Sequence, residues 1–265
     1  MQVIIMPTKA DASELAAAII EKRIHQHADS VLGLATGQTM ERLYARLARK
    51  HHEDGLDFSL IRTYNLDEYI GMEADDPNSY RSYMNKLLFD QVNIDLRNTH
   101  LPLGMAEDLE RECHLYERSI RTNGGIDLQL LGIGKTGHIG FNEPLSALKS
   151  RTRAKALTPT TIASNSPLFK NPEDMPKRAI TMGVGTILEA KSILMLVTGE
   201  SKAEILAKAV EGPVTSMVSG SALQLHENCT VIVDAGAGKL LEGKDYYNWI
   251  FQNEPEWEEF RTIKG

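Results

Sequence analysis

The 265-residue chain has only two cysteines, Cys113 and Cys229, and neither lies in a paired motif. A disulfide framework is therefore excluded as the basis of the fold, and two unpaired thiols favour a reducing compartment such as the cytoplasm. No stretch approaches the ~18 apolar residues that a membrane-spanning helix needs. No basic segment precedes the first apolar run, so Met1–Pro7 is expected to contain a first strand and not a signal peptide.

The sequence also lacks an excess of basic residues. Lys and Arg number 29 against 36 Asp and Glu, which gives a formal net charge of −7. This balance argues against a broad nucleic-acid-binding surface but is compatible with a local basic pocket. Hydrophobic residues make up 42% and charged residues 25% of the chain, as in ordinary globular proteins.

Apolar runs typical of strands alternate with helical patterns, and short polar loops lie between them. No repeat or Pro/Gly/Ser-rich linker divides the chain, so residues 1–265 are predicted to form a single domain. The alternation predicts an α/β fold with a parallel sheet covered by helices on both faces. The expected strands are 2–6, 30–34, 60–64, 126–133, 151–157, 192–197 and 230–233, and the expected helices are 10–25, 40–51, 79–89, 108–122, 201–210 and 246–252.

Four polar loops directly follow apolar runs, at residues 35–39, 65–69, 132–144 and 198–202. Ligands of open parallel sheets bind beyond the carboxyl ends of the strands. The four loops are therefore predicted to emerge at one edge of the sheet and to build one site from distant segments.

Two of these loops have the composition of anion-binding turns. Thr36, Gly37 and Thr39 stand at the start of a predicted helix, where free N–H groups and the helix dipole attract anions. The alternative is that Thr39 is only a helix cap. Loop 198–202 repeats the pattern, and its Lys202 lies where a cation opposes the helix dipole unless an anion is bound. An ordinary exposed lysine is the alternative there.

Residues 132–137 match two nucleotide-binding patterns incompletely. They read G-x-G-x-x-G, but Asn142-Glu143-Pro144 interrupts the long helix that a dinucleotide-binding unit requires. They also resemble the end of a Walker A loop, but Gln129 stands where its first glycine is needed. Neither motif is therefore expected to operate.

His138, Glu143 and Asp67 are the candidates for proton transfer. The ordinary pKa of histidine, near ~6.5, suits this role, and Glu143 could orient the imidazole of His138. The alternative is a structural histidine. A metal site is not expected, because there is no H-E-x-x-H motif and no cysteine or second histidine nearby. Asp67 follows a strand in a partly apolar loop and could act as a base, whereas two solvated acids, Asp67 and Glu68, are the alternative.

Five segments resemble the glucosamine-6-phosphate deaminase family. They are residues 34–39 (LATGQT), 64–69 (YNLDEY), 137–144 (GHIGFNEP), 151–153 (RTR) and 183–186 (GVGT). The likeness extends from the first strand to about Tyr247, and the GHIxFNEP and NxDEY segments are specific in combination. The 6-phosphogluconolactonases share the fold but are not expected to carry this set.

The resemblance implies a modified Rossmann-like three-layer sandwich and a reaction. Glucosamine 6-phosphate and water would yield fructose 6-phosphate and ammonia, by aldose–ketose isomerase chemistry, without a metal or redox cofactor. His138 matches the residue that opens the sugar ring, assisted by Glu143, and Asp67 matches the base that takes the C2 proton.

The resemblance also implies binding sites. Residues that match phosphate contacts are Thr36, Gly37, Gln38, Thr39 and Lys202. Many members are homo-oligomers, and some are activated by N-acetylglucosamine 6-phosphate. The residues that match this allosteric pocket are Ser146, Arg153, Lys155 and Tyr246, with Ala147 in place of a usual serine.

Two positions depart from the family pattern. Thr136 stands where an Asp or Asn is usual beside the catalytic histidine, and Pro167 stands where an arginine usually contacts the phosphate. The candidates to replace that arginine are Lys170, Lys177 and Arg178. These departures leave two alternatives open, namely a deaminase for another hexosamine phosphate such as galactosamine 6-phosphate, and a weakly catalytic sugar-phosphate sensor.

Overall fold

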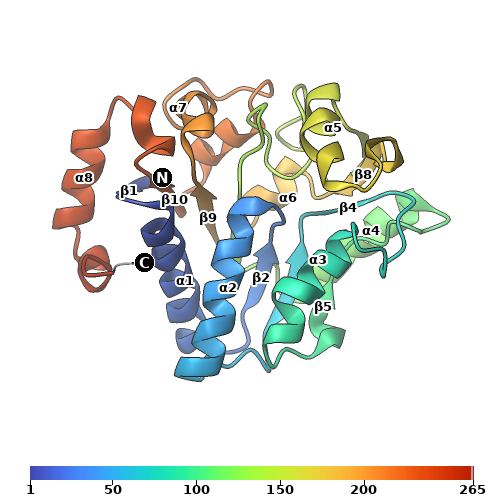
Figure 1. Ribbon diagram of the computed structural model, residues 1–265, viewed down its shortest axis with the longest axis horizontal. Helices are drawn as coiled ribbons and strands as arrows, with labels where there is room; N and C mark the ends of the chain where they lie inside the picture. Colours follow the sequence, from blue (N-terminus) through green and yellow to red (C-terminus); the bar gives the residue numbers. More distant parts are fainter. Residues whose placement is uncertain (264) are drawn as a thin grey trace.

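The computed structural model describes residues 1–263 and 265. Its central sheet has seven strands in the order β1-β10-β9-β6-β2-β3-β5, and all of its strand pairs are parallel (Figure 1). The strands are β1 (Gln2–Met6), β2 (Val31–Leu34), β3 (Arg62–Asn65), β5 (Thr99–His100), β6 (Leu128–Leu131), β9 (Ser192–Val197) and β10 (Cys229–Asp234). The predicted α/β class and parallel sheet are confirmed.

Helices cover both faces of this sheet. In Figure 1, α1 (Lys9–Gln26), α2 (Gln38–Asp54) and α3 (Tyr80–Leu87) lie side by side on the near face, and α4 (Leu109–Thr122) lies on the far side. Central strands that are covered twice need apolar residues at consecutive positions. The last five residues of β9 and all of β6 are accordingly buried.

The helix boundaries follow local signals in the sequence. Thr8 caps α1, since its hydroxyl accepts from the N–H of Asp11 while the Asp11 carboxylate accepts from the N–H of Thr8. Helix α2 ends at Asp54 and is followed by Gly55, whose φ of 73° is a left-handed conformation that glycine adopts without steric cost.

A second, smaller sheet was not predicted. It has the order β4-β8-β7 and is antiparallel throughout, with β4 (Asp67–Tyr69), β8 (Arg178–Thr181) and β7 (Arg153–Ala156). The prediction that 65–69 is a loop is therefore wrong for its last three residues. Strand β7 was expected, with one wet face, and its side chains are half-buried or exposed.

Helical segments follow the strands in the remainder of the chain. They are α5 (Pro159–Asn165), α6 (Val184–Leu188), α7 (Ala203–Val210) and α8 (Lys244–Asn253), together with short 3₁₀ turns that include 166–168, 200–202 and 219–225. Among the described residues, no helix combines the length and the hydrophobicity that crossing a bilayer requires.

Glu117 of α4 binds the segment before β7 and helix α6. Its buried carboxylate accepts from the N–H and hydroxyl of Thr152 at 2.8 and 2.6 Å, from the hydroxyl of Thr186 at 2.6 Å and from Arg151 at 2.6 Å. Burial opposes ionisation of Glu117, but these donors outweigh it and lower its pKa. The segment that leads into β7 is thereby fixed to α4.

Replacing this carboxylate should destabilise the protein. We expect Glu117→Gln to lower the free energy of unfolding by about 2–4 kcal/mol, because the Arg151 guanidinium loses a buried counter-charge. Urea unfolding would measure the change. Glu110→Gln, at an exposed position of the same helix, is the matched control. Equal effects of the two substitutions would contradict this role for Glu117.

Candidate active site

The four polar segments do meet at one edge of the central sheet. They follow β9, β6, β2 and β3, which are consecutive neighbours and run parallel. The Oγ1 atoms of Thr39 and Thr198 are 3.5 Å apart, and Lys202 Nζ donates to the carbonyl of Ile133 at 2.7 Å. The predicted convergence of the loops is confirmed.

Two helical turns at this edge begin without a side-chain cap. Gly37 precedes α2 with a φ of 120°, and Gly199 precedes the 200–202 turn with a φ of 96°. The alternative that Thr39 caps α2 is therefore wrong, because the cap position is Gly37. Uncapped N–H groups at a helix start are donors available to an anion. The flanking Thr36 and Thr39 are half-buried.

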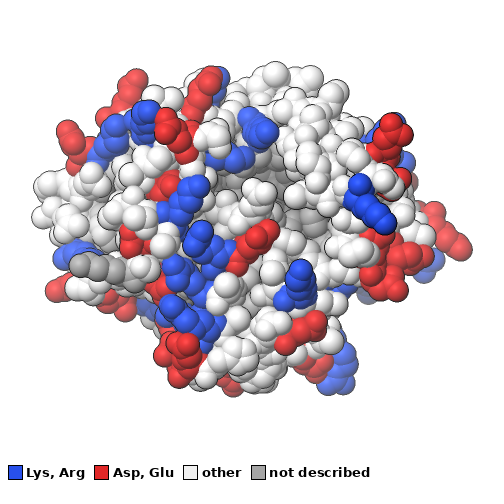
Figure 2. All heavy atoms as spheres, viewed as in Figure 1, with Lys and Arg blue, Asp and Glu red and all other residues white. Residues whose placement is uncertain are grey.

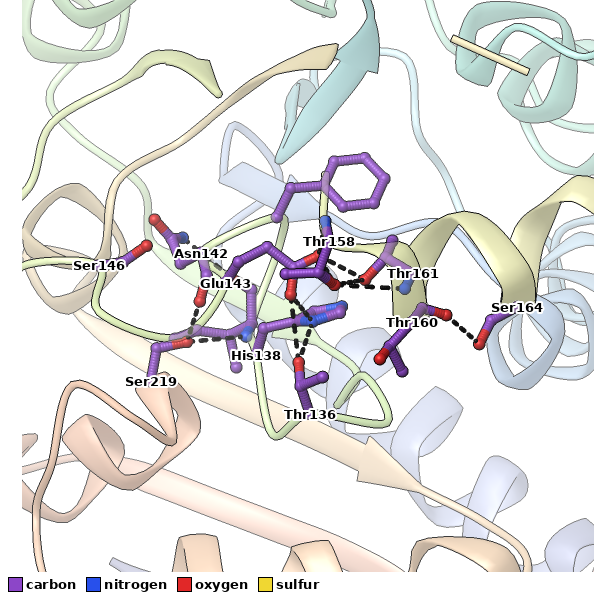
Figure 3. A network of polar contacts seen from close by, with 12 residues as sticks. Thr136, His138, Asn142, Glu143, Ser146, Thr158, Thr160, Thr161, Ser164 and Ser219 are labelled. Carbon is purple, nitrogen blue, oxygen red and sulfur yellow. Dashed lines mark hydrogen bonds and ion pairs between the residues drawn. The ribbon is translucent and has the colours of Figure 1, made fainter. Parts of the chain in front are cut away.

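His138 is held by one ring nitrogen and leaves the other free. Its Nδ1 lies 3.0 Å from Glu143 Oε2 and 2.7 Å from Thr136 Oγ1 (Figure 3). The Thr136 hydroxyl also donates to Glu143 Oε2 at 3.2 Å. A Cβ at Gly134 would lie 2.0 Å from Nε2, so glycine is what lets the ring occupy this place. Among the described residues, Nε2 has no hydrogen-bond partner.

Glu143 is the most fully bonded carboxylate of the site. Its Oε1 accepts from the hydroxyls of Thr158, at 3.1 Å, and Thr161, while Oε2 faces His138 (Figure 3). Burial by itself would raise the pKa of Glu143, but the His138 and threonine donors lower it to about 2. Glu143 therefore keeps a negative charge beside the imidazole across the physiological pH range.

Asp67 has the opposite environment. It is 5% exposed, and burial, together with the adjacent Glu68 carboxylate, raises its pKa to about 8. A Cβ at Gly140 would lie 3.4 Å from Asp67 Oδ2, so Asp67 borders the loop that carries His138. The alternative of two solvated acids is wrong, because Glu68 is also buried and accepts from the N–H groups of Tyr80 and Arg81 at the start of α3.

Aromatic rings supply the apolar surroundings of Asp67. The ring of Phe141 stacks on that of Tyr80, with centroids 6.1 Å apart, and lies 6.3 Å from the ring of His138. Tyr69, two residues after Asp67 on β4, contacts both Phe141 and Tyr80. Asp67 is buried where these segments meet, and the loss of water around its carboxyl group favours the neutral form.

The four residues expected in an allosteric pocket do not all come together. Ser146 is buried and its hydroxyl accepts from Arg153 Nη2 at 3.0 Å, while Lys155 is exposed two residues further along β7. Tyr246 is 63% exposed on α8, which packs on β1 at the far end of the central sheet (Figure 1). Within this chain, Tyr246 is therefore remote from Ser146 and Arg153.

The two departures from the family pattern occupy different environments. Thr136 lies inside the His138–Glu143 cluster and contributes a hydroxyl but no charge. Pro167 is exposed in the 166–168 turn that follows α5. Three side chains were candidates to replace an arginine there, namely Lys170, Lys177 and Arg178, and all three are exposed.

Sequence reasoning missed the threonines that hold Glu143. Thr158 caps α5, and Pro159 occupies the first turn of that helix. Threonine followed by proline is a recognisable helix start, so α5 was detectable from this signal. The contact of its first turn with a carboxylate 15 residues earlier depends on tertiary structure.

The carboxyl edge of this parallel sheet carries an imidazole, a buried carboxyl group and two turns with free N–H donors for an anion. This combination is typical of enzymes that act on small molecules by acid–base chemistry. Residues 8–231 match the family model of glucosamine-6-phosphate isomerases/6-phosphogluconolactonase, and the chain belongs to this family.

Relatives and solved structures agree with this assignment. The chain is 47% identical over 250 residues to a glucosamine-6-phosphate deaminase of Shewanella woodyi, covering 94% of this chain and 95% of the relative. It is 44% identical to that of Arthrobacter sp., covering 97% and 99%. A monomeric glucosamine-6-phosphate deaminase of known structure superposes with a TM-score of 0.89 at 44% identity, covering 91% of this chain and 100% of that one. A 6-phosphogluconolactonase from Leishmania guyanensis, with a TM-score of 0.69 at 22% identity over 90% of this chain and 97% of that one, shares the fold.

The raised pKa of Asp67 predicts that the free energy of unfolding depends on pH. Between about pH 4, the unfolded pKa, and about pH 8, the folded protein binds a proton that the unfolded chain releases, so the free energy of unfolding falls as pH rises. Asp67→Asn removes this penalty. We expect the variant to be more stable than the wild type by about 1–3 kcal/mol near pH 8, with the difference vanishing near pH 4.

Urea unfolding at several pH values would measure this difference. Asp90→Asn, at an exposed aspartate, is the control and should show no such trend. A stability difference for Asp67→Asn that does not depend on pH would contradict the protonated state of buried Asp67.

Proposed function

We propose that this protein is a glucosamine-6-phosphate deaminase, which converts glucosamine 6-phosphate and water to fructose 6-phosphate and ammonia. One observation carries the proposal. Asp67 borders the loop that holds His138, which is bonded to Glu143, and two helical turns without side-chain caps lie at the same edge of the sheet. The names and coverage of the relatives support the same reaction.

Ring opening is assigned to His138. The hexose ring opens when a proton leaves the O1 hydroxyl and another reaches O5, and one imidazole nitrogen can serve both transfers in turn. Nε2 is the nitrogen available for this, because Nδ1 faces Glu143 at 3.0 Å. The permanent charge of Glu143 stabilises the imidazolium that forms in between.

Isomerisation is assigned to Asp67. In its ionised form it takes the C2 proton of the open-chain aldehyde. The C2–H electron pair then forms the C1–C2 double bond, while the carbonyl π pair moves to the aldehyde oxygen, which takes a proton from water to give the enol. Protonation at C1 then leaves an imine at C2, and water hydrolyses it to the ketone and ammonia. Because a carboxyl group in an apolar site is a stronger base than one in water, the surroundings of Asp67 suit this abstraction.

The phosphate is assigned to the uncapped turns. The expected contacts are the N–H groups at the start of α2 and of Glu200 and Ser201, the hydroxyls of Thr36 and Thr39, and the ammonium of Lys202. The N–H of Gly199 is already bonded to the Asp234 carboxylate at 2.8 Å. Gly37 allows the chain to approach an anion closely, because its φ of 120° excludes most other residues. Gln38, the first residue of α2, contributes its backbone.

The central test is turnover by the purified protein. We expect ammonia and fructose 6-phosphate to appear in equal amounts from glucosamine 6-phosphate. Asp67→Asn should lower kcat at least about 10³-fold with little change in KM, since it removes the base but not the phosphate contacts. Asp90→Asn is again the control. A wild type without turnover, or an Asp67→Asn variant as active as the wild type, would reject the proposal.

Three finer expectations accompany this function. Activation by N-acetylglucosamine 6-phosphate near Ser146 and Arg153, a cytoplasmic location and a homo-oligomeric state remain predictions. The similar deaminase of known structure is described as monomeric. The observation that favours assembly is that Tyr246 and Trp249 expose 63% and 59% of their surface on α8.

Sedimentation velocity would measure the assembly state. We expect a species larger than 29.4 kDa that Trp249→Lys dissociates, because a charge would disrupt an apolar contact. Glu254→Lys, at an exposed position after α8, is the control for added charge. A wild type that sediments as a monomer at all concentrations would reject the homo-oligomer.

A further inference from the structure

Two lysines outside the assigned phosphate contacts lie near Lys202 or the Gly199 turn that precedes it. A Cβ at Gly199 would lie 3.4 Å from Lys9 Nζ and 3.7 Å from Lys9 Cε. Lys9 is the first residue of α1, which follows β1, so its side chain reaches this turn from a different loop of the sheet edge.

Lys135 lies in the loop that anchors Lys202, two residues after Ile133, whose carbonyl accepts from Lys202 Nζ at 2.7 Å. It is one residue before Thr136 and is exposed. Burial lowers the pKa of Lys202, and the positive charge of Lys135 lowers it further.

These positive charges lack negative partners. Within the described part of the chain, no carboxylate lies within 4.0 Å of the ammonium of Lys9, Lys135 or Lys202. Some other cationic side chains are paired, as Lys239 is with Glu200 and Arg46 is with Glu14. Glu41, an acid in the first turn of α2, pairs with none of the three.

The positions of Lys9 and Lys202 at helix starts make their charges unfavourable when no anion is bound. A cation in the first turn of a helix opposes the helix dipole, and Lys9 is in the first turn of α1 while Lys202 immediately precedes α7. Figure 2 shows blue side chains gathered over the part of this face that carries α1, α2 and α7, next to a hollow. A bound anion would relieve both the mutual repulsion and the unfavourable dipole interactions.

We propose that Lys9 and Lys135 are phosphate-binding residues that act with Lys202 around the Gly199 turn. The inference rests on the proposed function and assigns two residues of this chain to the charge recognition of its substrate. A sugar phosphate carries close to two negative charges at neutral pH, so three monodentate ammonium groups from separate loops match its charge.

The test is the binding of fructose 6-phosphate and of inorganic phosphate, measured by calorimetry at low salt. Lys9→Met and Lys135→Met should each raise the Kd for both ligands about three- to tenfold and flatten its dependence on salt. Lys9→Arg and Lys135→Arg should restore most of the affinity. In the deamination assay, KM should rise by the same factor while kcat at saturation stays within about twofold, because neither lysine touches the reacting carbons.

Lys86→Met is the matched control, because Lys86 is exposed in the last turn of α3 and has no ion-pair partner among the described residues. Wild-type affinity in both Lys9→Met and Lys135→Met, alongside weakened binding in Lys202→Met, would overturn the proposal. If the wild type fails to deaminate glucosamine 6-phosphate but binds phosphate in a lysine-dependent way, only the deaminase assignment fails.

Discussion

The site depends on two buried carboxyl groups that lie in opposite electrostatic environments. Glu143 is surrounded by donors and stays charged, whereas Asp67 is surrounded by aromatic rings and an acid and holds a proton up to about pH 8. The same chemical group thus becomes a permanent anion in one place and a base in the other. The protein must keep these two environments separate, although Glu143 lies at the end of the loop 137–143 and Asp67 borders the same loop.

The two sheets provide that separation. Asp67 begins a strand of the small antiparallel sheet, while His138 follows a strand of the large parallel one. The loop that carries His138 follows β6 of the large sheet and is bonded to the end of β8 in the small one. The N–H of Phe141 donates to Thr181 Oγ1 at 3.0 Å and Asn142 Nδ2 donates to the carbonyl of Met182 at 2.8 Å.

The sequence predicts the large sheet well because its signals are local. Continuous apolar runs such as 192–197, each followed by a polar loop and a helical pattern, indicate buried parallel strands and the edge where ligands bind. The small sheet escaped prediction because its strands are short and β4 pairs with β8 more than 100 residues further along the chain. Asp67, His138 and Glu143 could be named from their residue types and from the family resemblance. The ionisation of Asp67 and Glu143 could not, because it depends on burial and on donors such as Thr161, which only the folded chain brings near.

The anchoring of Glu143 by α5 couples a peripheral helix to the reacting groups. Thr158 and Thr161 hold the carboxylate from the first turn of a seven-residue helix that lies outside the main core. Fraying of that turn on warming would release the imidazole while the central sheet remains folded. Heat inactivation of this protein should accordingly begin below the temperature at which its bulk helical signal is lost.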